Sequence, residues 1–242
     1  MGLKAALTKF FNRYFFNSDW RCLNCGCEIF DKNKFCDACE KTLPYNDGYI
    51  CAHCGRKVIA PENYCSTCKG ILTALDGCRS YFNYEKPIST LIKRLKYGNA
   101  RYLIEYFTDT LSVLYAKNYY NADYITFVPM TEKAKRRRGY NQSELLAKSL
   151  SEKIGVPTLD CLVKVKETKR QVTLRRSERF KNLIEAFRVT DKKAVKGKTV
   201  VIVDDVTTTG ATAQALAERL KKAGALKVYL LTVASRPPID KY

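Results

Sequence analysis

Residues 200–212 constrain the fold of this chain more than any other stretch. Four consecutive apolar residues come first, followed by Asp204 and Asp205 and then by a threonine-rich loop with one glycine, Gly210. An uninterrupted apolar run is typical of a parallel strand that is covered on both faces. Residues 211–223 have the composition and spacing of a helix. The stretch therefore predicts a buried strand, a short loop and a helix.

The loop lies where an anion is favoured. A helix begins with backbone N–H groups that have no partner within the helix, and the threonine hydroxyls add further donors. Two adjacent carboxylates at the end of a strand are costly to bury unless they meet hydroxyl groups or a metal ion. A ribose phosphate satisfies both requirements, although an ordinary polar turn is the alternative.

The same thirteen residues resemble the signature of type I phosphoribosyltransferases. In that family the two acids contact the ribose hydroxyls of phosphoribosyl pyrophosphate (PRPP), and the loop wraps its 5′-phosphate. The resemblance implies that Asp204 and Asp205 orient the ribose as catalytic residues and that Mg²⁺ accompanies PRPP. It places the 5′-phosphate on Thr207, Thr208, Thr209, Gly210, Ala211 and Thr212.

Eight of the eleven cysteines form a repeat of two four-cysteine sets, with the second set 29 residues after the first. In a chain without an export signal, paired C-x-x-C knuckles favour tetrahedral zinc over disulfides. We expect two structural zinc ions, paired sequentially or in an interleaved way. His53 is expected to be a bystander, and Cys27, Cys78 and Cys161 to be buried. The expected ligands are Cys22, Cys25, Cys36 and Cys39, with Cys51, Cys54, Cys65 and Cys68.

The remaining apolar patterns alternate between strands and helices. Residues 77–84, 124–128 and 226–234 read as further strands, with helices over 87–98, 101–120 and 143–154. This order predicts an α/β fold, a doubly wound parallel sheet of the type I phosphoribosyltransferase kind, with its ligand at the carboxyl ends of the strands. The expected domains are an N-terminal amphipathic segment (1–20), a double zinc ribbon (21–76) and a phosphoribosyltransferase-like domain (77–242).

The formal net charge is +19, and residues 131–188 alone carry a net +9. An excess of positive charge attracts polyanions. Nucleic acid and the polyphosphate of PRPP are two possible explanations of this charge. We expect a basic loop over 133–142 and a mobile lid over 164–188. The residues expected to bind pyrophosphate are Lys96, Lys133, Arg138, Asn141 and Gln142. The residues expected to bind nucleic acid are Lys135, Arg136, Arg137 and Tyr140.

No window approaches eighteen consecutive apolar residues, and charged residues interrupt the apolar ones throughout residues 1–20. The sequence therefore predicts neither a membrane span nor a signal peptide, and we expect a cytoplasmic protein. The first twenty residues are expected to form a helix packed on its own domain, with docking on a partner or a membrane as the alternative.

Taken together, the cysteine knuckles, Leu95-Lys96-Tyr97, the run 138–142 and the Asp204-Asp205 loop resemble the ComF family of late competence proteins. The resemblance implies DNA uptake in natural transformation, with PRPP, single-stranded DNA and a helicase of the ComFA type as partners. Two alternatives are a nucleobase-salvage phosphoribosyltransferase and a PRPP sensor without turnover. A salvage enzyme needs a base pocket after the last strand, and little sequence follows Ser235. The acceptor substrate and the oligomeric state stay open.

Overall fold

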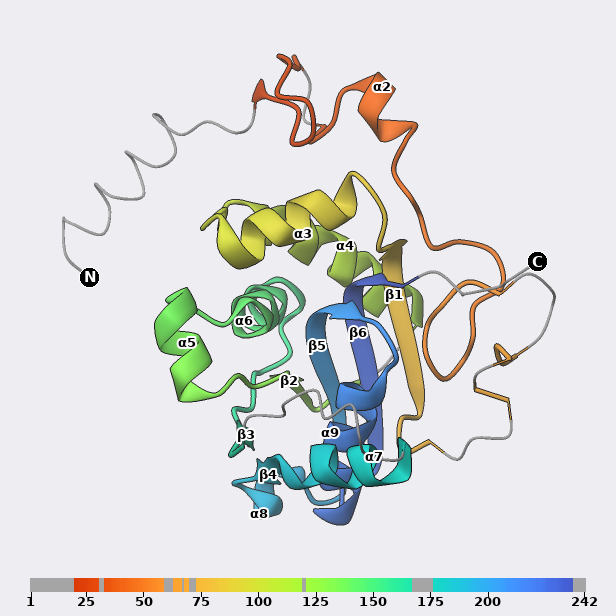
Figure 1. Ribbon diagram of the computed structural model, residues 1–242, viewed down its shortest axis with the longest axis vertical. Helices are drawn as coiled ribbons and strands as arrows, with labels where there is room; N and C mark the ends of the chain where they lie inside the picture. Colours follow the sequence, from red (N-terminus) through yellow and green to blue (C-terminus); the bar gives the residue numbers. More distant parts are fainter. Residues whose placement is uncertain are drawn as a thin grey trace. The chain divides into compact units, whose positions relative to one another are not determined.

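The structure is a computed structural model, and its chain divides into two compact units, residues 1–43 and 44–242 (Figure 1). It describes residues 20–30, 33–58, 63–66, 68–69, 73–118, 121–166 and 176–236. Most of the expected N-terminal segment therefore lies outside the described residues. The second cysteine set belongs to the same unit as the sheet, whereas the first belongs to the other unit. The expected boundary between residues 76 and 77 stays a prediction.

Four parallel strands form the central sheet of the larger unit, in the order β1-β6-β5-β2. The register pairs Asp204 with Thr232 and Thr207 with Ser235, so the acidic end of β5 lies beside the end of β6. The prediction of a parallel sheet is confirmed. β1, β2 and β6 lie within one residue of their expected bounds, whereas β5 continues past the acid pair to Thr207, which was expected in the loop. The strands are β1 (Gly77–Asn83), β2 (Tyr124–Phe127), β5 (Thr199–Thr207) and β6 (Lys227–Ser235).

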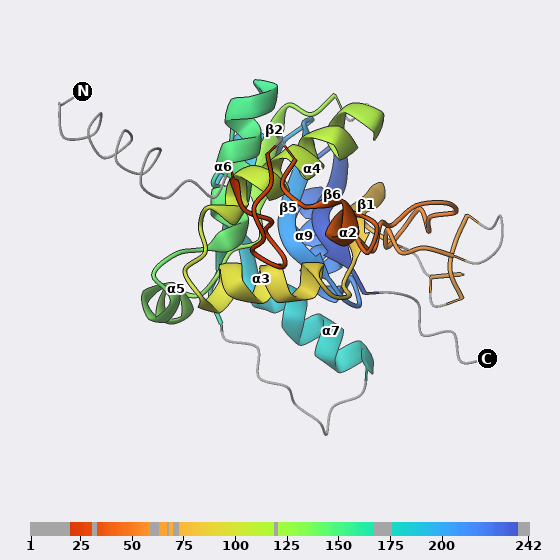
Figure 2. The ribbon, with the colours of Figure 1, turned by 90° about the horizontal axis from the view of Figure 1, so that it is seen from above.

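Helices cover both faces of this sheet, as a doubly wound fold requires. Val200 and Ile202 of β5 belong to one apolar cluster with Leu216 of α9 (Ala211–Lys222). The alternate residues of a strand point to the opposite face, where α4 (Leu103–Asn118) and α6 (Gln142–Ile154) pack on the strands and on each other. Figure 2 shows α4 and α6 on one side of the strands and α7 on the other. Further helices are α3 (Ile88–Tyr97) and α7 (Arg176–Glu185).

The remaining elements are short. An antiparallel pair, β3 (Leu162–Lys164) with β4 (Phe187–Val189), lies beside α8 (Lys192–Val195), and α2 (Asp37–Glu40) belongs to the smaller unit. Residues 167–175 of the expected lid lie outside the described residues. The described part of that segment packs on the core, because α7 contacts α9 and Phe187 is fully buried. Within the part of the chain that the structure describes, no helix is both long and apolar enough to cross a bilayer.

The basic run after β2 is a helix, so the prediction of a loop there was wrong. Helix α5 covers Glu132–Arg138 and begins after Thr131, whose side chain accepts a hydrogen bond from the Ala134 N–H. It ends at Gly139, whose φ of 85° is the left-handed conformation common after helices. Lysine and arginine are good helix formers, and both caps are supplied by the sequence. The cationic side chains are therefore displayed on one short helix.

Candidate functional site

The two carboxylates lie at the carboxyl end of β5, and Asp205 is held by a lysine. The Lys96 Nζ lies 2.6 Å from the Asp205 Oδ2, and the Val206 N–H donates to the Asp205 Oδ1 at 2.9 Å. Asp205 is only 2% exposed. A buried carboxylate without a partner is costly. Lys96, in the last turn of α3, therefore compensates the charge of Asp205.

Asp204 meets a hydroxyl group instead of a cation. The Ser143 Oγ donates to the Asp204 Oδ1 at 2.6 Å, and the Asp205 N–H donates to the same oxygen at 2.9 Å. Burial, and then the neighbouring charge of Asp205, raise the pKa of Asp204 to about 7, with the Ser143 hydrogen bond and Lys96 opposing them. The sequence analysis missed Ser143, because a serine at the start of a helix usually reads as part of a cap.

The loop between β5 and α9 presents open backbone donors. Gly210 has a φ of 73° and precedes the helix, and the Ala211 N–H is 3.4 Å from the Thr209 Oγ1. The N–H groups of Thr209, Gly210 and Thr212 have no hydrogen-bond partner among the described residues. Thr207 is buried, whereas Thr208 and Thr209 are exposed. Donors at the start of a twelve-residue helix, with its partial positive charge, suit a phosphate group.

Arg56, two residues after Cys54 of the second cysteine set, also contacts this loop. The sequence analysis did not predict this contact. Its Nη2 donates a hydrogen bond to the carbonyl oxygen of Thr208. The two residues are 152 positions apart, and no local pattern could have joined them.

Asn141 and Gln142 were expected to bind pyrophosphate, and both have hydrogen-bond partners within the protein. The Asn141 side chain accepts from the Ser143 N–H at 3.1 Å and donates to the Val128 carbonyl at 3.0 Å. The Gln142 Oε1 accepts from Arg138. Both residues are buried, and Asn141 caps the start of α6. Pyrophosphate binding by the two stays a prediction. Lys96 lies at the site but pairs with Asp205, and Lys133 is exposed on α5.

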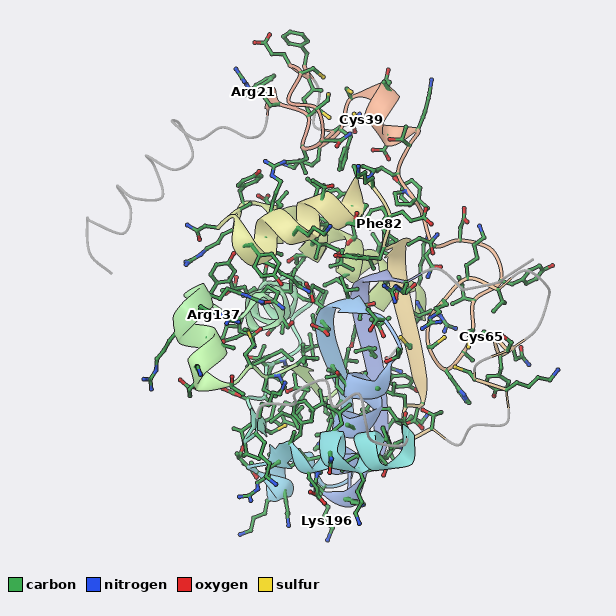
Figure 3. All side chains as sticks on the ribbon, viewed as in Figure 1. Arg21, Cys39, Cys65, Phe82, Arg137 and Lys196 are labelled. Atoms are coloured by element: carbon green, nitrogen blue, oxygen red, sulfur yellow. The ribbon has the colours of Figure 1, made fainter. Side chains whose placement is uncertain are left out.

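The residues expected to bind nucleic acid divide into two groups. Arg136 and Arg137 are exposed on α5, where Figure 3 labels Arg137, whereas Lys135 pairs with Glu144 at 2.9 Å. Tyr140 is 6% exposed and its hydroxyl donates to the Leu95 carbonyl. Its ring therefore has no free face for a base, and the expectation that Tyr140 binds nucleic acid is corrected on this ground.

The two cysteine sets form separate four-sulfur clusters, paired sequentially. The Cys25 and Cys36 sulfurs are 3.8 Å apart, and the Cys54 and Cys65 sulfurs are 3.7 Å apart. Tetrahedral zinc with Zn–S bonds of about 2.3 Å places its ligand sulfurs about 3.8 Å apart. Each cluster therefore fits one zinc ion, and Figure 3 labels one cysteine of each.

The residues around the clusters agree only in part with expectation. His53 is not a member of either cluster, and its ring lies 4.3 Å from that of Tyr64. Cys78 and Cys161 are buried, as predicted. Cys27 is exposed, so its predicted burial was wrong. It closes the knuckle turn through its backbone, because its carbonyl accepts from the Cys22 N–H at 2.8 Å.

Comparison with protein families agrees with this architecture. Residues 15–69 match the double zinc ribbon domain, and residues 140–239 match the phosphoribosyl transferase domain. The second match contains Ser143, the acid pair and the loop, and the first contains both cysteine sets.

Comparison with known proteins gives the family. Competence protein F of Haemophilus influenzae is 32% identical, over 91% of this chain and 98% of that protein. The chain belongs to the competence protein F family. DNA utilization protein YhgH of Escherichia coli is 34% identical over 60% of this chain and 66% of its own. Competence protein ComFC of Bacillus subtilis is 26% identical over 60% of this chain and 58% of its own.

A solved structure is similar to part of this competence protein F family member. Glutamine PRPP amidotransferase from B. subtilis has 23% identity and a TM-score of 0.40, over 54% of this chain and 26% of that chain.

We predict two zinc ions per chain, each held by its own cluster. Cys36→Ser should release one ion, and Cys65→Ser should release the other, because each cluster draws on one cysteine set only. Structural zinc contributes on the order of 10 kcal/mol to small zinc domains, so each substitution should unfold its own ribbon. Metal analysis of the purified variants measures the stoichiometry. Loss of both ions from either single variant would contradict independent clusters.

The raised pKa of Asp204 predicts a pH-dependent stability. An aspartate whose pKa is about 7 in the folded state and about 4 in the unfolded state destabilises the fold increasingly from pH 4 to pH 7. Asp204→Asn removes this cost. Because one pKa unit corresponds to about 1.4 kcal/mol, the variant should gain on the order of 4 kcal/mol over wild type at pH 8 and about 1 kcal/mol at pH 5.

Denaturant unfolding at the two pH values measures this difference. Asp160→Asn, at an exposed position, is the matched control for the loss of one carboxylate. A constant difference between wild type and Asp204→Asn across this range would refute the raised pKa.

Proposed function

We propose that this chain is a PRPP-binding DNA-uptake protein that acts in the cytoplasm with single-stranded DNA and a helicase partner of the ComFA type. The PRPP part rests on one observation. Two carboxylates and several backbone N–H groups without hydrogen-bond partners among the described residues lie near each other at the carboxyl end of β5. The DNA part is supported by relatives named for competence and for DNA utilization.

In this proposal the 5′-phosphate of PRPP accepts hydrogen bonds from the N–H groups of Thr209, Gly210 and Thr212. A phosphate replaces none of the existing hydrogen bonds there, because these donors have no partner among the described residues. The ribose hydroxyls then reach Asp204 and Asp205, whose carboxylate oxygens also suit the Mg²⁺ that accompanies PRPP.

Lys96 changes partners in this scheme. Its ammonium group lies 2.6 Å from the Asp205 carboxylate and compensates its charge. The same group places a compact positive charge next to the proposed ribose site. A bound ribose that hydrogen-bonds Asp205 frees the ammonium to face the pyrophosphate. If transfer occurs, cations at the pyrophosphate stabilise the leaving group as the bond to the ribose breaks.

The proposed DNA surface lies on α3, on the segment that follows it and on α5, where two tyrosine rings lie beside arginines. Arg138 lies 5.2 Å from the ring centre of Tyr97, and Arg94 lies 5.9 Å from that of Tyr102. Tyr97 is 76% exposed, so its ring can accept a base. Stacking platforms beside arginines are the usual means of binding single strands without sequence preference. Tyr97, unlike the buried Tyr140, therefore has a ring that a base can reach.

We predict that Asp204→Asn with Asp205→Asn abolishes PRPP binding. The two substitutions remove the charges that meet the ribose hydroxyls and Mg²⁺ but leave the size of the side chains unchanged. Isothermal titration of PRPP with Mg²⁺ measures the affinity, and Asp160→Asn is again the control. PRPP affinity equal to that of wild type in the double variant would overturn the proposed site. Turnover of PRPP with a free nucleobase would instead favour the salvage enzyme.

For DNA, we predict that Tyr97→Ala weakens the binding of single-stranded oligonucleotides at every salt concentration. One stacked base is worth roughly 1–3 kcal/mol, which corresponds to about a 5- to 150-fold loss of affinity. Tyr49→Ala, an exposed tyrosine beside the second cysteine set, is the matched control.

Arg136→Gln with Arg137→Gln should act differently from Tyr97→Ala. It should lower the slope of log affinity against log salt by about 1.4 if both arginines touch phosphates of a single strand. Wild-type affinity and slope in all of these variants would exclude α3 and α5 as the DNA surface.

A further inference from the structure

Arg56 links the second cysteine cluster to the loop after β5. It follows Cys54 by two residues, and its side chain is buried to 8% exposure. The Nη2 donates to the carbonyl oxygen of Thr208, while the Nε is buried without a partner. A guanidinium is costly to bury in this way, and no carboxylate pairs with it among the described residues. Among the described residues, its one side-chain hydrogen bond is to the proposed phosphate loop.

The backbone of Arg56 is fixed by the knuckle itself. The Cys51 N–H donates to the Arg56 carbonyl at 2.8 Å, and the Gly55 N–H donates to the Cys51 carbonyl at 2.9 Å. Cys51 belongs to the second four-sulfur cluster. A zinc ion at that cluster therefore holds the turn from which Arg56 extends.

The turn is also seated on β1. The Cys78 N–H donates to the Ala52 carbonyl at 3.2 Å, and the Asn46 side chain donates to the Gly55 carbonyl at 2.7 Å and to the Ser80 carbonyl at 3.0 Å. A side chain at Gly55 would bring a Cβ to 2.9 Å from the Cys78 sulfur, at a φ of 70°. Only glycine allows this close approach, which places the next residue within reach of the loop.

The first cysteine set shows the same turn without this contact. The Cys22 N–H donates to the Cys27 carbonyl at 2.8 Å, as the Cys51 N–H does to Arg56. The residue 29 positions before Arg56 is Cys27, which is exposed, and a Cβ at Gly26 would meet nothing within 4 Å. The repeat therefore supplies the turn, and Arg56 with Gly55 specialises the second copy.

The hydrogen bond from Arg56 has a consequence for the loop. In a trans peptide the C=O and the following N–H point in opposite directions. With the Thr208 carbonyl directed at Arg56, the Thr209 N–H is directed away from the knuckle. That N–H is one of the open donors to which the phosphate is assigned.

We propose that Arg56 is a positioning residue for the phosphate loop, and that zinc in the second cluster controls the affinity for the sugar phosphate through it. The ligand class is a pentose 5-phosphate, and in this respect the inference rests on the proposed function. Arg56 acts through the Thr208 peptide and needs no contact with the ligand.

The test compares Arg56→Met with Lys57→Met. Lys57 is the adjacent cation, is exposed and pairs with Asp47 at 2.7 Å, so its loss controls for a change of charge at the same turn. Amide hydrogen exchange of residues 208–212 in the free protein reports the order of the loop. Titration with ribose 5-phosphate, which lacks the pyrophosphate, reports the sites for the 5-phosphate and the ribose without the pyrophosphate site.

We expect Arg56→Met to keep both zinc ions, to exchange its loop amides at least 10-fold faster and to bind ribose 5-phosphate at least 10-fold more weakly. Lys57→Met should behave as wild type does. Wild-type loop exchange in Arg56→Met with two zinc ions bound would overturn the proposal.

A second pair of variants tests the dependence on zinc. Cys65→Ser should accelerate loop exchange as Arg56→Met does, whereas Cys36→Ser, which loses the zinc of the other cluster, should leave it unchanged. Equal effects of the two cysteine variants would overturn the assignment of control to the second cluster. If wild-type protein binds neither PRPP nor ribose 5-phosphate, the proposed function fails, whereas the exchange measurements still decide whether Arg56 orders the loop.

Discussion

The ion pair between Lys96 and Asp205 is the interaction on which the rest of the site depends. Adjacent carboxylates at the end of a buried strand repel each other and lose hydration, so both need partners from elsewhere in the chain. Lys96 of α3 supplies a cation and Ser143 of α6 supplies a hydroxyl. These contacts draw two helices to the carboxyl end of β5, which is where a doubly wound fold places its ligand.

The two cysteine sets show how one sequence repeat serves two purposes. Their knuckles have the same spacing, matching backbone hydrogen bonds and similar distances between sulfurs, 3.8 Å and 3.7 Å. The first belongs to the small unit, whereas the second is seated on β1 by Asn46 and Gly55. Zinc stabilises a ribbon that has little core of its own. In the second copy, zinc also holds the turn from which Arg56 donates its hydrogen bond to the loop after β5.

The fold was predictable because its signals are local. A parallel sheet is predicted by the apolar run at 200–203 and by the strand patterns over 77–84 and 226–234. The cysteine spacing predicts the two clusters. Helix α5 escaped prediction because its run of cations has no apolar period, although Thr131 and Gly139 mark its ends. The contacts of Ser143 and Arg56 span 61 and 152 residues, and only the folded sheet brings them to the loop.

The central claim is that a sugar phosphate binds at the carboxyl end of β5, and a crystal structure with ribose 5-phosphate tests it most directly. The account predicts that the phosphate oxygens accept hydrogen bonds from the N–H groups of residues 209–212. It also predicts that the ribose hydroxyls lie against Asp204 and Asp205. A phosphate bound on the arginines of α5, with the loop after β5 unchanged, would contradict the account.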